Sequence, residues 1–99
     1  MKKQFVKALF DLHCDWEGLP PSYRIYVNDE LFAERTYYWV DEYLKETLQI
    51  EAPAGIYHVK FEPLKPNLAK FRLENHRIEH GSAKWVDPQT LEIIFDATT

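Results

Sequence analysis

The chain has 99 residues, which is enough for one hydrophobic core, so we expect a single domain over residues 1–99. Hydrophobic residues make up 45% and charged residues 28%, as in ordinary globular proteins, and this composition argues against a disordered chain. Twelve basic and sixteen acidic residues give a net charge of −4, which argues against nucleic acid or an anionic membrane as a partner.

Apolar and polar residues alternate with a period of two along most of the chain, and this period is typical of β-strands. The first strand is expected over residues 6–12, with one apolar face, and Gly-Leu-Pro-Pro at 18–21 ends regular structure. Tyr23, Ile25 and Val27 share a face of the next strand. Residues 28–30 form a tight turn into a strand over 31–38.

The second half of the chain continues the same pattern. A strand over 44–50 carries Glu46 among apolar neighbours, and the turn at 52–55 leads into a strand over 56–62. A polar strand follows at 70–79, and a hairpin is expected at 83–95, with its turn at residues 87–89. Short strands punctuated in this way predict an all-β protein, an antiparallel β-sandwich or jelly roll of seven to nine strands.

One segment also fits a helix. Val40, Tyr43, Leu44 and Thr47 have helical spacing, and three acidic residues lie between 41 and 46. A short helical turn near residues 39–46 is therefore the alternative to an extended chain there.

The first residues resemble a signal peptide, but Lys7 and Asp11 interrupt the apolar stretch before it reaches the usual length. No run approaches the roughly 18 apolar residues of a membrane span. Cys14 is the single cysteine, so neither an internal disulfide nor a cysteine-rich zinc site is expected. We therefore predict a soluble product in a reducing compartment, with no membrane partner.

The triplet at residues 13–15 combines histidine, cysteine and aspartate, as in cysteine hydrolases. On a strand, however, His13 and Cys14 point to opposite faces, so Cys14 is expected to be a structural thiol. His76 and His80 would lie about 13 Å apart along a strand, which is too far for one zinc ion. The sequence therefore predicts no catalytic residue, no metal site and no enzyme activity.

No cofactor is expected, and the alternative is a bound calcium ion, because acidic residues lie in expected loops. Glu30, Asp87, Asp96 and the pair at 41–42 offer the oxygen ligands that calcium takes. No Asp-x-Asp-x-Asp-Gly series is present, so solvated acids are the simpler interpretation.

An aromatic run at residues 37–39, with Tyr43 close by, indicates a contact surface. On a strand at least one large ring of this run faces away from the core, and rings with a polar group favour interfaces and stack on sugars and bases. The alternative is that these rings fill the core, as we expect of Trp16 and Trp85. The candidate ligand-binding residues are Tyr37, Tyr38, Trp39, Asp41, Glu42 and Tyr43.

A family resemblance rests on the stretches RIYVNDELF (24–32), ERTY (34–37), EAPAGIYHV (51–59) and FRLENHRIEHG (71–81). Together they resemble small uncharacterised proteins encoded by marine tailed phages, which implies a place in the cytoplasm of an infected host or in the virion. The order of strands is similar, more faintly, to calcium-dependent xylan-binding carbohydrate modules. Those modules are β-sandwiches without catalytic activity that use loop carboxylates to hold calcium and sugar hydroxyls.

Two functional hypotheses follow. In the first, the protein is a non-catalytic module whose aromatic patch stacks on a carbohydrate. In the second, it is a phage structural or accessory protein that binds another protein or a second copy of itself, through the patch and the strand at 70–79. A small metal-dependent hydrolase that uses the histidines is a third and weaker alternative.

Overall fold

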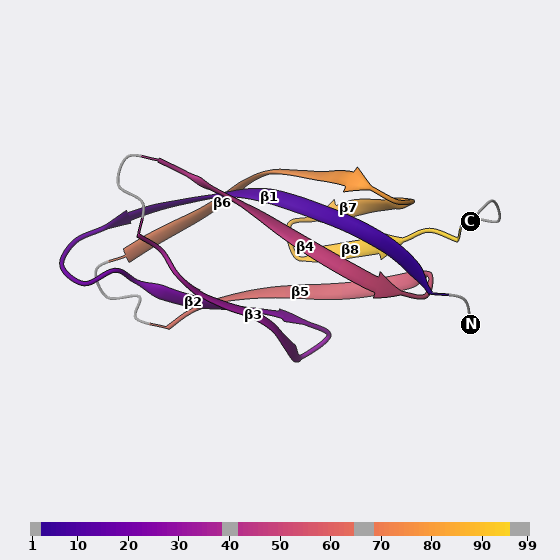
Figure 1. The fold of residues 1–99 in the computed structure, drawn as a ribbon, viewed down its shortest axis with the longest axis horizontal. Helices are drawn as coiled ribbons and strands as arrows, with labels where there is room; N and C mark the ends of the chain where they lie inside the picture. The colour runs from indigo at the N-terminus through magenta and orange to yellow at the C-terminus, as the bar shows by residue number, and fades with distance from the viewer. Residues whose placement is uncertain (1–2, 39–41, 65–68, 96–99) are drawn as a thin grey trace.

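The computed structural model describes residues 3–38, 42–64 and 69–95, which form two antiparallel sheets and contain no helix (Figure 1). The eight strands confirm the predicted all-β sandwich. Their bounds are β1 Gln4–Trp16, β2 Ser22–Val27, β3 Glu30–Thr36, β4 Leu44–Ala52, β5 Gly55–Pro63, β6 Ala69–His80, β7 Ala83–Asp87 and β8 Thr90–Ile93.

The smaller sheet has the strand order β4-β1-β6 and the larger sheet β3-β2-β5-β8-β7. β1 is the longest strand, with 13 residues, and it lies at the centre of the smaller sheet. Its alternating residues Val6, Ala8, Phe10 and Leu12 are buried against the larger sheet, because every second side chain of a strand points to the same face. The period of two in the sequence therefore defines the inner layer of this sheet.

Both sheets contribute to one core. Tyr23, Phe61 and Phe71 bring their rings together between the sheets, and Tyr37 meets Phe71 edge to face at 6.2 Å between ring centres. The buried apolar residues of this core are Val6, Ala8, Phe10, Leu12, Leu48 and Ile50 from the smaller sheet, Tyr23, Ile25, Val59, Leu91 and Ile93 from the larger sheet, and Tyr37.

The prediction of a helical turn near residues 39–46 is wrong for residues 42–46, which the structure describes. Leu44 begins β4 and pairs with Leu12, and Glu46 pairs with Phe10. The hydrogen-bond ladder to β1 and the burial of alternate β4 side chains outweigh a local helical preference. Residues 39–41 lie outside the described residues.

Glu46 is the polar residue that interrupts the apolar face of β4, and it is buried with 2% of its surface exposed. Tyr23 donates a hydrogen bond to its carboxylate at 2.6 Å, and Arg35 donates two, at 2.8 and 3.0 Å. Burial, and then the bond to Glu46, raises the pKa of Tyr23 well above its usual range. The hydrogen bonds to Glu46 also raise the pKa of Arg35. These bonds join β3 and β2 of one sheet to β4 of the other.

The turn predicted at residues 28–30 is a two-residue connection between β2 and β3. Asn28 and Asp29 have φ angles of +50° and +67°, as a type I′ hairpin requires. Asn28 donates its backbone N–H to the carbonyl of His58, and its side-chain oxygen accepts from the backbone N–H of His58, both at 2.8 Å. The turn is thus fixed to β5, the next strand of the sheet.

Trp16 and Trp85 both pack against the core, as predicted. The indole of Trp85 donates to the carbonyl of Arg77 at 3.1 Å and contacts the ring of His76 edge to face. His76 also stacks on Phe10, and its Nε2 atom is buried without a hydrogen-bond partner among the described residues. Burial lowers the pKa of His76 below its ordinary value of 6.5.

The free energy of unfolding is expected to fall as the pH drops below about 6.5, where an unfolded histidine takes up a proton that folded His76 resists. His76→Phe keeps a ring against Phe10 and Trp85 but cannot titrate, so this part of the pH dependence should disappear. Urea titrations of both proteins between pH 7 and pH 5 measure the effect. Parallel pH profiles for the two proteins would contradict it.

Candidate functional site

The outer face of the smaller sheet carries a shallow hollow of about 160 Å³ near the end of β1. β1 and β6 form two sides of the hollow, and the segment that precedes β4, with Glu42 and Tyr43, forms another side. His13 and Asp15 alternate with inward-facing Leu12 on β1, so their side chains lie on the outer face. The residues that line the hollow are His13, Cys14, Asp15, Glu42, Tyr43, Lys70 and Arg72.

Tyr43 is the aromatic side chain of this hollow. Its ring stacks on the imidazole of His13, with 5.4 Å between ring centres and 28° between planes. Yet 55% of Tyr43 is exposed, so much of the ring is open to solvent. His13 therefore supports an exposed aromatic surface, which is the kind of surface that ligands stack against.

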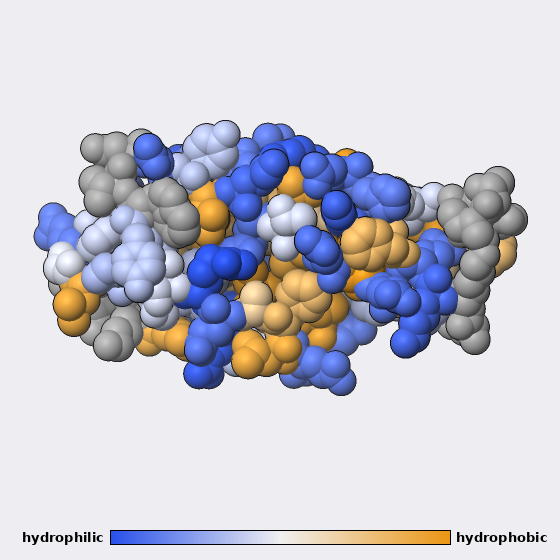
Figure 2. All heavy atoms as spheres, in the orientation of Figure 1, coloured by the Kyte–Doolittle hydropathy of each residue, from blue (hydrophilic) through white to orange (hydrophobic). Residues whose placement is uncertain are grey.

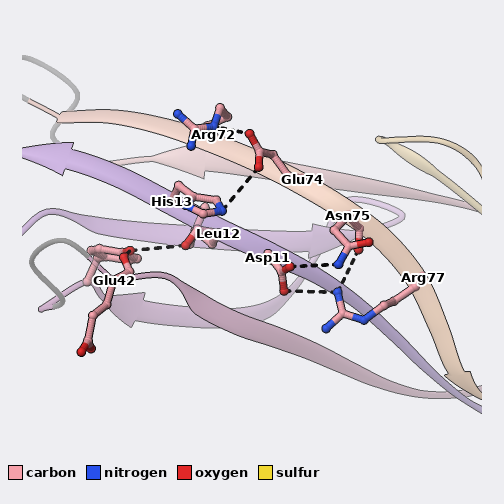
Figure 3. Close-up of polar contacts among 9 residues, drawn as sticks. Asp11, Leu12, His13, Glu42, Arg72, Glu74, Asn75 and Arg77 are labelled. Carbon is pink, nitrogen blue, oxygen red and sulfur yellow. Dashed lines mark hydrogen bonds and ion pairs between the residues drawn. The ribbon is translucent and has the colours of Figure 1, made fainter.

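Charged side chains surround Tyr43. His13 Nε2 lies 3.5 Å from Glu74 Oε2, and Arg72 forms an ion pair with the other oxygen of Glu74 (Figure 3). Glu74 thus links β1 side chains to β6 side chains beside the hollow. Lys70 and Arg72 contribute two positive charges to the lining and Asp15 and Glu42 two negative ones, so donors and acceptors are both present.

A β-bulge next to the hollow fixes β6 against β1. The register shifts between Leu9 and Asp11, and Asn75 takes a φ angle of +54°, which asparagine tolerates better than most residues. Asn75 donates to one oxygen of Asp11 at 3.1 Å and Arg77 to the other at 3.2 Å (Figure 3). Burial alone would raise the pKa of Asp11, but these two hydrogen bonds outweigh it and lower the pKa.

The structure separates the predicted ligand-binding residues. Tyr43 and Glu42 line the hollow, and Tyr38 is 67% exposed but does not line it. Trp39 and Asp41 lie outside the described residues.

Tyr37 is fully buried, so it packs in the core and the prediction that it contacts a ligand is wrong. It follows β3 with its side chain directed inward, whereas the next ring, Tyr38, points outward. Its hydroxyl donates to the carbonyl of Glu42 at 2.6 Å and lies 3.3 Å from the carbonyl of Leu12. Tyr37 therefore holds the segment that presents Glu42 and Tyr43, and burial raises its pKa.

Cys14 has the properties expected of a structural thiol. It packs against the core on the opposite face of β1 from His13, and its sulfur lies 3.8 Å from the carbonyl of Asp15. Burial, with a contribution from Asp15, raises the pKa of Cys14 to about 11, so the thiol stays protonated at neutral pH. In the described ranges, no three His, Cys, Asp or Glu side chains are grouped so as to hold a metal ion.

A larger hollow of about 590 Å³ opens between the sheets. It forms where β8 ends its pairing with β5, because the two strands pair only from Gly55 to His58. Its floor is apolar and its rim carries charges, so it suits an apolar group more than a sugar. The floor consists of Phe10, Ile25, Val59, Phe61 and Leu73, and Asp29, Lys60 and Asp87 lie among the rim residues.

Comparisons with known proteins found no matching family model, curated protein or solved structure. The resemblances to phage proteins and to xylan-binding modules therefore stay predictions from the sequence. Among the described residues, no helix has the length and apolar character needed to cross a membrane.

Proposed function

We propose that the protein is a non-catalytic binding module for a carbohydrate, with the outer-face hollow as its site. The observation that carries the proposal is Tyr43, an exposed ring supported by His13 and surrounded by charged side chains. The C–H faces of a sugar ring are apolar and stack on aromatic rings, whereas the hydroxyls at its edge need donors and acceptors. This hollow offers both.

The size and charge of the hollow indicate the kind of sugar. Its volume of about 160 Å³ lies below the roughly 300 Å³ at which pockets begin to enclose whole small molecules. We therefore assign it to one unit of a longer glycan that crosses the surface. The positive charges of Lys70 and Arg72 balance the negative charges of Asp15 and Glu42 in the lining. A neutral sugar therefore fits the hollow better than an acidic one.

Tyr43→Ala is expected to weaken glycan binding roughly tenfold, since it removes the stacking surface but leaves the fold intact. Tyr38→Ala is the matched control, because Tyr38 is equally a solvent-exposed tyrosine but lies outside the hollow. A glycan array that includes xylan fragments would identify a ligand, and calorimetry of the three proteins, with and without calcium, would measure it. Equal affinities for both variants, or binding of no glycan, would contradict the proposal.

Open strand edges favour the second candidate, a protein that binds other proteins. The strand predicted for this role, at residues 70–79, is β6, and β6 does lie at an edge of the smaller sheet. Its register with β1 shifts twice and it carries many charges, which are features that discourage strand pairing. A role in phage assembly therefore stays a prediction, and β6 is not its best contact surface.

A further inference from the structure

β4 is the most regular open edge of the two sheets. Its nine residues pair with β1 from Leu12–Leu44 to Gln4–Ala52 without a shift, and its other side has no neighbouring strand among those described. Each of the other edge strands, β3, β6 and β7, has a register shift against its neighbour. Such shifts blunt an edge, so β4 is the edge best suited to pair with another strand.

The outward-facing side chains of β4 are complementary in charge to those of a second, antiparallel copy of the same strand. Lys45, Thr47, Gln49 and Glu51 point to the outer face and alternate with inward-facing residues such as Leu48. Lys45 and Glu51 lie three residues to either side of Leu48 and carry opposite charges. Neither side chain forms an ion pair within the described part of the chain, so both charges are available to a partner.

We propose that two copies of the chain associate by antiparallel pairing of their β4 strands, with the two-fold axis at Leu48. In this register Lys45 of each copy lies opposite Glu51 of the other, and residues directly opposite in an antiparallel pair point to the same face. A shift by two residues would place Gln49 or Pro53 opposite Lys45 and lose both attractive pairs. The charges therefore select one register.

Two features of this side of the sandwich support the pairing. Glu46 is an inward-facing charge, which would oppose association at an edge, but Arg35 and Tyr23 of its own copy already satisfy it. A hollow of about 330 Å³ with a mixed polar and apolar lining lies between β4 and β3, and two of its apolar lining residues, Leu31 and Phe32, are 57% and 39% exposed. Figure 2 shows an apolar patch in this region, at the lower centre of the face. A second copy beside β4 would reduce its exposure to water.

The pairing does not depend on the proposed carbohydrate site. It would join the two smaller sheets into one continuous sheet whose outer faces lie on the same side. The two hollows that contain Tyr43 would then face in one direction. A surface that repeats a ligand could engage both hollows at once.

Sedimentation analysis over a range of protein concentrations tests the pairing. The full chain is expected to form a dimer that weakens at high salt, because its register depends on exposed charges. Lys45→Glu and Glu51→Lys should each weaken the dimer at least tenfold, since each places like charges opposite one another. Lys84→Glu, at an exposed lysine of the edge strand β7, is the control and should leave the dimer unchanged.

Charge reversal provides the decisive comparison. The double variant Lys45→Glu/Glu51→Lys restores both attractive pairs, and so does an equimolar mixture of the two single variants, so both samples should dimerise. Circular dichroism of each variant shows that the fold is retained. A full chain that is monomeric at every concentration, a dimer unaffected by the single variants, or a double variant that stays monomeric would overturn the proposal.

Discussion

Gly81→Ala is expected to lower the free energy of unfolding by about 3 kcal/mol. Gly81 connects β6 to β7 with a φ angle of +93°, a conformation that costs about 1–2 kcal/mol for a residue with a Cβ atom. That Cβ would also lie 2.5 Å from the carbonyl oxygen of Phe5 and 3.1 Å from the Cα of Val6. Backbone atoms cannot move aside as a flexible side chain can, so overpacking adds about 1–3 kcal/mol. Chemical denaturation measures the loss.

Gly18→Ala is the matched control. Gly18 has a similar φ angle of +80°, but no atom lies within 4 Å of the position that its Cβ would take. This variant should therefore lose only the backbone contribution, about 1–2 kcal/mol. Equal losses for the two variants would show that the connection at Gly81 can relax away from β1.

Arg35→Gln is expected to destabilise the protein by about 3 kcal/mol at neutral pH, since removal of one partner leaves the other charge buried. Glu46 is 2% exposed and would keep only the hydrogen bond from Tyr23. Urea unfolding of the variant and the parent at neutral pH measures the loss.

Arg24→Gln makes the same substitution in an exposed ion pair, which joins β2 to β3. Arg24 and Glu34 are both well exposed, with side-chain exposures of 40% and 50%, so water replaces most of what the pair contributes. We expect a loss much smaller than that of Arg35→Gln. If Arg24→Gln destabilised the protein as much as Arg35→Gln, burial of Glu46 would not explain the effect of Arg35→Gln.

Much of the sandwich could be predicted from the sequence, because its strands follow a local period. The alternation of Val6, Ala8, Phe10 and Leu12 is enough to define a buried face of β1. Glu46 was visible as an anomaly on β4, but its partner Arg35 lies on another strand and no local pattern connects them. The order of the strands likewise depends on pairings that alternation does not encode.

The candidate site was predictable only in part. Tyr43 and Glu42 stood out because they belong to an aromatic and acidic segment. Lys70 and Arg72 did not, because they reach the hollow only when β6 pairs with β1, which places Arg72 opposite His13. The sequence alone did not determine whether the ring of Tyr37 faces the core or the solvent. The direction of the chain after β3 places this ring in the core.

The central position of β1 also affects the order of folding. Lys7 pairs with His80 and Ala8 with Ile78, so one long edge of β1 finds its partner only after most of the chain has been made. During synthesis this apolar strand emerges before both of its pairing partners, first β4 and then β6. Pairings between such distant segments slow folding to a scale of milliseconds to seconds. Cotranslational protection of the nascent amino-terminal segment is therefore expected to raise the yield of native protein.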